Sequence, residues 1–165
     1  MTGKVRGPED LTLRDTLESD LEIFFNNQLD KEAGHMAAFT AKDPTDREAY
    51  FTKWKKLLQD DTKYNQTILW DELIVGSISS YAMAGELHVT YWISKQYWGK
   101  GIATNALLAF LKKMHKRPLF GSAAFDNLAS QRVMEKCGFK FLQLEKGFAN
   151  ARDQEIEERI YCLAE

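Results

Sequence analysis

The sequence predicts a mixed α/β fold in which helices flank one central sheet of parallel and antiparallel strands. Three consecutive segments rich in β-branched and aromatic residues, 67–70, 74–81 and 87–93, predict an antiparallel meander. A helical pattern over residues 102–114 and a short apolar strand over 119–125 follow them. A strand, a helix and a further strand in this order predict a parallel strand pair.

The N-terminal part of the chain is expected to hold a strand and then a helix. Residues 11–14 alternate between apolar and polar, as a half-buried strand does. Asp15 or Thr16 can cap the following helix, whose apolar side chains recur at helical spacing over residues 17–29. Gly34 is expected to break this pattern.

The second helix and the C-terminal elements have clear boundary signals. Asp43-Pro44 predicts the start of a helix, because Asp is a good cap and Pro is tolerated in a first turn. Residues 127–137 predict another helix, which Gly138 ends in the role of a C-terminal cap. The last strands are expected over residues 139–144 and 156–163.

Length and composition favour one soluble domain. A chain of 165 residues with 44% hydrophobic and 28% charged residues can bury a real core, so residues 1–165 are expected to form a single domain with its core over about 10–164. The net charge of −2 gives no basic footprint for nucleic acid. No apolar run approaches the roughly 20 residues of a membrane helix. The first residues show no leader-type apolar segment, so a cytoplasmic location is expected.

The cysteines give no sign of metal binding. Cys137 and Cys162 are the only two, they stand far apart, and no histidine cluster accompanies them. We therefore expect no metal site, and a reducing compartment is sufficient for the protein.

The most informative segment is Gln96-Tyr97-Trp98-Gly99-Lys100-Gly101-Ile102-Ala103-Thr104, between a predicted strand and a predicted helix. Two glycines allow a tight turn and a close approach of a ligand to the backbone. The helix that follows directs free N–H groups and the positive end of its dipole at the loop. Such a loop is suited to bind a diphosphate. It matches neither the dinucleotide-binding nor the P-loop pattern.

Two motifs resemble the GNAT acetyltransferase superfamily. Gln-x-x-Gly-x-Gly at residues 96–101, followed by a small residue, resembles the family's coenzyme A signature. Residues 127–139, with Asn127, Ser130, Val133 and Gly138-Phe139, resemble the helix found in its branch of ribosomal-protein N-terminal acetyltransferases. The resemblance covers the chain from about residue 10 to the end and is strongest over residues 87–141.

The resemblance implies an acetyl-CoA-dependent N-acetyltransferase with a GNAT-like fold. The cosubstrate is then acetyl-CoA, and the partner is an amine acceptor. In the family, the exposed edge of the fourth strand pairs with the pantetheine amides, and the loop binds the pyrophosphate. The implied coenzyme-binding residues are Tyr91, Trp92, Ile93, Gln96, Trp98, Gly99, Lys100, Gly101, Ile102, Ala103, Thr104, Asn127 and Ser130.

The catalytic groups are less well marked. By resemblance, a backbone N–H of the strand around Tyr91 holds the oxyanion. Many relatives place a tyrosine, as the acid for the thiolate, at the position that Met134 occupies here, and a thioether cannot donate a proton. Ser130 is the candidate replacement, although it can equally bond its own helix backbone. Asn127 can bind pantetheine, cap its helix, or do both.

No side chain is marked clearly as the general base. Some relatives have a glutamate where Ser122 stands, and the other candidates are Glu86, His88 and His35. His35, between the first two helices, is placed where relatives line the acceptor site, but bulk water can also take the proton. The glutamates of residues 155–158 are expected at a solvated strand edge, or else attract a cationic acceptor.

Two other functions remain open. A coenzyme A-binding module without turnover is favoured by the residues at positions 122 and 134, and a nucleotide-binding regulatory domain would bind ATP or NAD instead. The acceptor can be an N-terminal peptide, a polyamine, an amino acid or a drug amine. The protein can be a monomer or a homodimer.

Overall fold

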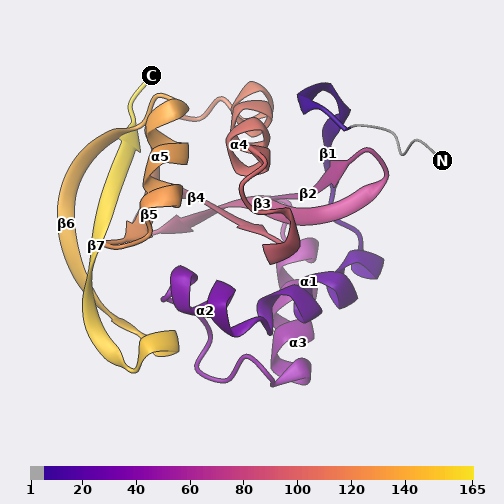
Figure 1. Ribbon diagram of the computed structural model, residues 1–165, viewed down its shortest axis with the longest axis horizontal. Coiled ribbons are helices and arrows are strands. Elements are labelled where there is room, and N and C mark those ends of the chain that lie inside the picture. Colours follow the sequence, from indigo (N-terminus) through magenta and orange to yellow (C-terminus); the bar gives the residue numbers. More distant parts are fainter. Residues whose placement is uncertain (1–5) are drawn as a thin grey trace.

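The computed structural model describes residues 6–165 and is built on one mixed sheet of seven strands, in the order β1-β2-β3-β4-β5-β7-β6 (Figure 1). The strands are β1 (Leu11–Asp15), β2 (Tyr64–Trp70), β3 (Leu73–Met83), β4 (Glu86–Ile93), β5 (Leu119–Ala124), β6 (Lys140–Ala149) and β7 (Gln154–Leu163). The helices are α1 (Leu21–Gln28), α2 (Lys31–Ala37), α3 (Arg47–Gln59), α4 (Ile102–Lys113) and α5 (Leu128–Lys136). The first residues of the N-terminus that we expect to lack a leader segment lie outside the described range. Among the described helices, none is both long enough and apolar enough to cross a membrane.

The strand pairing confirms the predicted antiparallel meander and the predicted parallel strand pair. Strands β1 to β4 form an antiparallel series. Strand β5 then lies parallel to β4, because α4 carries the chain back along the sheet between them. Strands β7 and β6 complete the sheet as an antiparallel hairpin, with β7 paired to β5.

Helices cover the two faces of this sheet unequally. Helices α4 and α5 lie on one face, whereas α1, α2 and α3 lie on the other, below β1 to β5 in the view of Figure 1. The main apolar cluster lies under α4 and α5, since alternate residues of each strand point to that side. Its largest fully buried members are Tyr161, Phe110, Ile68, Ile78, Leu107, Leu119 and Met134.

Several predicted boundaries in the first half of the chain are wrong. Gly34 does not end a helix but lies inside α2, a separate helix that Asp30 caps through a hydrogen bond from the backbone N–H of Ala33. Helix α3 begins at Arg47, with Asp46 as its cap, and not at Asp43-Pro44. In both places the helix begins at an aspartate other than the residue expected at the boundary: Asp30 caps α2, and Asp46 caps α3.

The last two strands are longer than predicted, and β7 is not an edge strand. It lies between β5 and β6, and Glu158 is paired on both sides and partly buried, whereas residues 155–157 are paired with β6 alone and Glu155 and Glu157 are exposed. Their side chains alternate between the two faces, which puts neighbouring glutamates of this segment in different surroundings.

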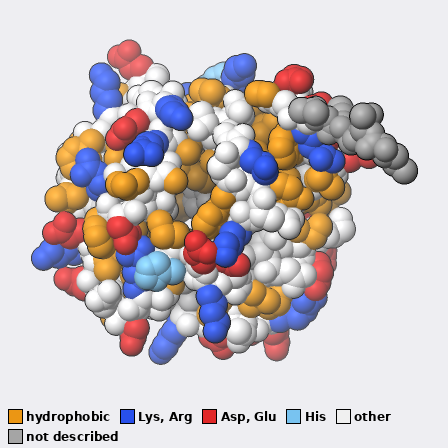
Figure 2. All heavy atoms as spheres, viewed as in Figure 1, with side chains coloured by type: hydrophobic (Ala, Val, Ile, Leu, Met, Phe, Trp, Pro, Cys, Tyr) orange, Lys and Arg blue, Asp and Glu red, His pale blue; other side chains and the backbone are white. Residues whose placement is uncertain are grey.

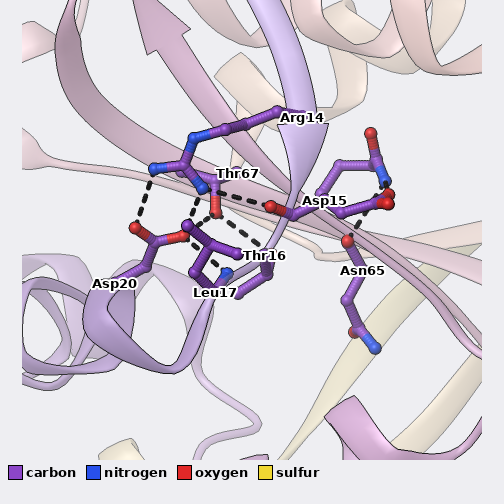
Figure 3. A network of polar contacts seen from close by, with 8 residues as sticks. Arg14, Asp15, Thr16, Leu17, Asp20, Asn65 and Thr67 are labelled. Atoms are coloured by element: carbon purple, nitrogen blue, oxygen red, sulfur yellow. Dashed lines mark hydrogen bonds and ion pairs between the residues drawn. The ribbon is translucent and has the colours of Figure 1, made fainter.

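A buried carboxylate joins the first strands to the helical layer (Figure 3). Asp20 is only 2% exposed, and its side chain accepts hydrogen bonds from both terminal nitrogens of Arg14, from the N–H of Leu17 and from the hydroxyl of Thr67. Because the one hydroxyl proton of Thr67 goes to Asp20, the Thr16 hydroxyl, 3.1 Å away, donates to Thr67, so Thr16 is part of this network and does not cap a helix. The network fixes β1 and β2 to the turn that begins α1.

The ionisation of Asp20 is part of this arrangement. Burial alone disfavours the charged carboxylate, but the hydrogen bonds from Arg14, Leu17 and Thr67 outweigh that effect and lower the pKa of Asp20. The ionised Asp20 carboxylate therefore adds to the free energy of unfolding. Its contribution is complete above the unfolded-state pKa of about 3.9 and is lost as the pH falls through the lower pKa of the folded state.

We expect Asp20→Asn to lower the free energy of unfolding at neutral pH by about 1.5–3 kcal/mol, because hydrogen bonds to a charged group are lost. Urea unfolding at successively lower pH values should show this difference shrinking below the pKa of an unperturbed aspartate. Glu18→Gln, in the same turn but exposed, is the matched control and should change stability little. An equal loss in both variants would contradict the assignment.

Candidate active site

The candidate site begins where two parallel strands separate. Strands β4 and β5 pair only at Leu87 with Leu119 and at His88 with Phe120. From residue 89 to 93, β4 is paired with β3 on one side, and in the described part of the chain no strand pairs with its other side. Figure 2 shows a hollow bordered by hydrophobic side chains over this region, between α5 and the start of α4. The exposed backbone groups there are available to a ligand.

The glycine loop predicted from the sequence leads out of this strand into α4. Gly99 and Gly101 both have φ of 75°, in the left-handed region that glycine adopts without strain. Gly101 is the N-terminal cap of α4, and a Cβ atom there would meet only the Asn105 side chain at 3.7 Å. The backbone is thus open to close approach, and the first N–H groups of a twelve-residue helix face the loop.

The other residues of the loop differ in how exposed they are and in what they contact. Gln96 and Lys100 are exposed, whereas Ile102 is buried and Ala103 and Thr104 are partly buried on α4. Trp98 does not simply cover the loop, because its indole N–H donates to the carbonyl of Ile93 at 2.8 Å. This bond joins the loop to the end of β4.

Tyr91 and Ser130 meet across the gap. The hydroxyl of Tyr91, on β4, lies 2.6 Å from the hydroxyl oxygen of Ser130, on α5, and either group can donate. Burial raises the pKa of Tyr91 to about 12, against the opposing hydrogen bond from Ser130. Both groups therefore stay protonated at neutral pH, and the pair can pass a hydrogen bond or a proton to a ligand between the strands.

Asn127 fixes the start of α5. Its side-chain oxygen accepts from the N–H of Ser130 at 3.2 Å, and its amide nitrogen donates to the carbonyl of Met36 at 3.3 Å. Asn127 is therefore a helix cap that also connects α5 to α2. A contact of Asn127 with a coenzyme stays a prediction.

Met134 is buried in the apolar cluster between α5 and β5. It is 1% exposed, and a Cβ atom added at Gly121 would come within 2.6 Å of its sulfur. The side chain fills the core against β5, so the position that holds a tyrosine in many relatives is structural here. A hydroxyl group lies instead on β4, at Tyr91, and the alternation of side chains along this strand could have indicated that it faces α5.

His35 is exposed on α2 and lies near the β5–α5 turn. Its carbonyl accepts from Arg152, whose guanidinium also makes a bidentate ion pair with Asp126 at 2.8 Å. Arg152 lowers the pKa of Asp126, and His35 adds to this effect. Among the described residues, no contact joins the His35 side chain to Tyr91 or Ser130, so its catalytic role stays a prediction.

The other sequence candidates for a base lie on the opposite face from Tyr91. His88 is 5% exposed and stacks on Tyr81, and its Nε2 lies 3.6 Å from a carboxylate oxygen of Glu86, too far for a hydrogen bond. Ser122 is exposed on β5, on the same face of the sheet as Glu158 of β7. Sequence reasoning named Glu158 among the glutamates of residues 155–158, but the strand register that brings it next to β5 is set by the folded sheet. Within residues 6–165, no group of three or more His, Cys, Asp or Glu side chains is placed to hold a metal ion.

Comparison with known proteins gives the class of this protein. Residues 10–140 match the family model described as "Acetyltransferase (GNAT) domain", which extends from the start of the sheet to the end of α5. The chain therefore belongs to the GNAT acetyltransferase family, and the protein is an acyltransferase. A search among curated proteins gave no match.

Solved structures confirm the fold. The microcin C7 self-immunity acetyltransferase MccE, in complex with acetyl-CoA and AMP, aligns with a TM-score of 0.80 at 16% identity, over 95% of this chain and 93% of its own. The ribosomal L7/L12 α-N-protein acetyltransferase RimL, in complex with coenzyme A, aligns with a TM-score of 0.79 at 18% identity, over 94% of both chains. A GNAT-family acetyltransferase from Bacillus anthracis aligns with a TM-score of 0.76 at 20% identity, over 96% of this chain and 97% of its own.

We expect Met134→Tyr to destabilise the protein by about 1–3 kcal/mol, because the larger ring would overpack a filled core. Met134→Leu conserves volume and should cost less than about 1.5 kcal/mol. Chemical denaturation of the two variants measures the difference. If the tyrosine variant is as stable as the leucine variant, the side chain at this position is free to turn toward the gap.

Proposed function

We propose that this protein transfers the acetyl group of acetyl-CoA to a primary amine by direct attack of the amine on the thioester. The observation that carries this proposal is the unpaired edge of β4, which lies between the glycine loop and the Tyr91–Ser130 pair. In this proposal, acetyl-CoA contacts three parts of the site in turn. Its diphosphate binds the glycine loop, its pantetheine arm follows the free edge of β4, and its thioester lies near the hydroxyl donor. The single sheet that runs through residues 11–163 supports one domain as the working unit.

The loop and strand fit a coenzyme that is long and partly anionic. The N–H groups at the start of α4 suit the pyrophosphate, and the β4 backbone suits the two amides of pantetheine. Gly99 and Gly101 keep the approach to the backbone clear, and Lys100 can add charge from an exposed position. MccE binds acetyl-CoA and RimL binds coenzyme A on the same fold, which supports this choice of ligand.

The transfer step uses groups on both sides of the gap. The neutral amine nitrogen forms a bond to the thioester carbon, and a tetrahedral oxyanion results, for which a backbone N–H of residues 91–93 is the proposed donor. The C–S bond then breaks as the carbonyl reforms, and the nitrogen, which carries an extra proton after attack, gives that proton to solvent water. Ser130, backed by Tyr91, donates a proton or hydrogen bond to the leaving thiolate, and the positive end of the α5 dipole favours the same charge.

A coenzyme A-binding module without turnover is the alternative. Met134 and Ser122 favour it in the sequence, since each stands where relatives have a proton-transferring residue. The hydrogen-bonded hydroxyls of Tyr91 and Ser130 weigh against it, because they offer a donor beside the gap from a different residue. Binding of coenzyme A without acetylation of any amine would select the alternative.

We expect acetyl-CoA at about 100 times its dissociation constant to stabilise the fold by about 2.7 kcal/mol, and Gly101→Asp to abolish that effect. The new carboxylate would stand where the diphosphate belongs. Gly85→Asp is the matched control, because Gly85 also has positive φ, 80°, and open space around it, but lies in the β3–β4 turn. Thermal melts with and without acetyl-CoA test this. A shift that survives in folded Gly101→Asp, or is lost equally in both variants, would refute the loop assignment.

We expect Ser130→Ala to lower turnover by about 10- to 100-fold, with little change in acetyl-CoA affinity, because one proton donor is lost after binding. Tyr91→Phe should lower turnover less, since Ser130 remains, and the double variant should resemble Ser130→Ala if the hydroxyls act as one unit. Steady-state thiol release and calorimetric coenzyme binding separate the two effects. Full turnover in Ser130→Ala would mean that solvent protonates the thiolate.

A further inference from the structure

The outermost strand of the sheet exposes a long apolar edge. Strand β6 ends the strand order beyond its hairpin partner β7 and is the outer arc at the left of Figure 1. It is ten residues long and has no proline, and in the described part of the chain no strand pairs with its outer side. Its large apolar side chains are about half exposed: Phe141 47%, Leu142 52%, Leu144 51% and Phe148 58%. A long apolar edge of this kind is a template for pairing with another chain.

A bulge at Leu142 decides which side chains of β6 share a face. Lys140 is paired with Cys162 of β7, and Glu145 is paired with Glu158. Since Cys162 and Glu158 are four residues apart on a strand, and paired residues share a face, Lys140 and Glu145 lie on the same face of the sheet. Residues five apart on a regular strand would lie on opposite faces, so this arrangement depends on the extra residue of the bulge.

The same shift brings two apolar residues together on the other face. Phe141 is paired with Tyr161, and Leu144 is paired with Arg159. Both therefore lie on the side of α5, to which the Tyr161 hydroxyl is hydrogen-bonded. The Arg159 guanidinium lies 4.1 Å from the centre of the Phe141 ring and holds it against the sheet. The strand thus has charged residues at one spacing on one face and apolar residues at a matching spacing on the other.

The charges of this strand are not matched within one chain. Glu145 lies opposite Glu158 across the hairpin, and like charges opposite each other destabilise a strand pair. The Glu145 carboxylate accepts a hydrogen bond of 2.8 Å from the side-chain amide of Gln143. Among residues 6–165, neither Glu145 nor Lys140 forms an ion pair. A lysine brought opposite Glu145 from outside the chain would offset the repulsion.

We propose that two copies of this chain associate through β6, antiparallel about a twofold axis at the centre of residues 140–145, so that one sheet continues into the other. In this register Lys140 of each copy lies opposite Glu145 of the other, and Phe141 lies opposite Leu144. Both pairs share a face, as antiparallel pairing requires, because of the bulge. The twofold axis makes each contact twice. This association does not depend on the proposed acetyl transfer.

Other registers lack this complementarity. After the bulge the side chains alternate regularly, so a twofold register within residues 143–149 must be centred on one residue. Centred on Glu145 or on Lys146, it places like charges of the two copies opposite each other. Centred on Leu144, it places Lys146 opposite Leu142. The register across the bulge is the one that pairs opposite charges.

Reversal of the two charges tests this register. We expect the natural protein to be a dimer that dissociates on dilution. Lys140→Glu and Glu145→Lys should each raise its dissociation constant by about 10-fold or more, because like charges then meet at both ends of the paired segment. An equimolar mixture of the two variants should recover a dimer, since every opposing pair in the heterodimer has unlike charges. Sedimentation velocity over a range of concentrations measures all of these. Hydrogen exchange should show protected outward-facing amides in residues 140–145 of the dimer only.

Lys146→Glu is the matched control, because Lys146 is exposed, lies on the other face of β6 from Glu145 and is outside the paired segment. It changes the net charge as much as Lys140→Glu does and should leave the dissociation constant unchanged. A natural protein that stays monomeric would overturn the proposal. So would a dimer that neither reversal weakens, an equal weakening by Lys146→Glu, or a mixture of folded single variants that does not recover the dimer.

Discussion

The separation of β4 from β5 is the constraint on which the rest of the site depends. Parallel strands gain stability from every shared hydrogen bond, yet these two share only two residue pairs and then diverge. The backbone groups of residues 89–93 on that side are left for other partners, and a sheet interior offers few. One of these backbone groups is paired within the protein, since the Trp98 indole N–H donates to the carbonyl of Ile93. A ligand with its own amides can form hydrogen bonds with the other backbone groups, and this favours pantetheine over a purely apolar ligand.

The gap also connects two faces of the sheet that differ chemically. On the side of α4 and α5 it meets hydroxyl groups, those of Tyr91 and Ser130, near the positive end of a helix. On the other side the sheet carries a partly buried carboxylate, Glu158, cross-strand from Ala124 of β5 and Glu145 of β6.

The sequence could predict those parts of the protein that depend on local pattern. Order of elements, the parallel β4–β5 pair and the glycine loop all follow from periodicity and turn chemistry within short segments. The errors arise where several residues compete for one role, as when Asp30 and Asp46 cap helices near other candidate positions. Contacts between distant strands could not be predicted, because register between β5 and β7 is set by the folded sheet. The Tyr91–Ser130 pair is of this kind, because it joins a strand to a distant helix, and the site residues themselves stay predictions.

The Tyr91–Ser130 pair brings a hydroxyl group to the gap from a strand that the family motif on α5 does not include. Catalysis requires a proton donor and a proton acceptor at certain places around the thioester, whereas the backbone position that supplies each one is free to vary. Where a tyrosine on α5 is absent, the phenol comes from β4 and meets the helix at Ser130. Ser130 holds the Tyr91 hydroxyl 2.6 Å from its own. The Met134 side chain instead packs against Gly121 and fills the core.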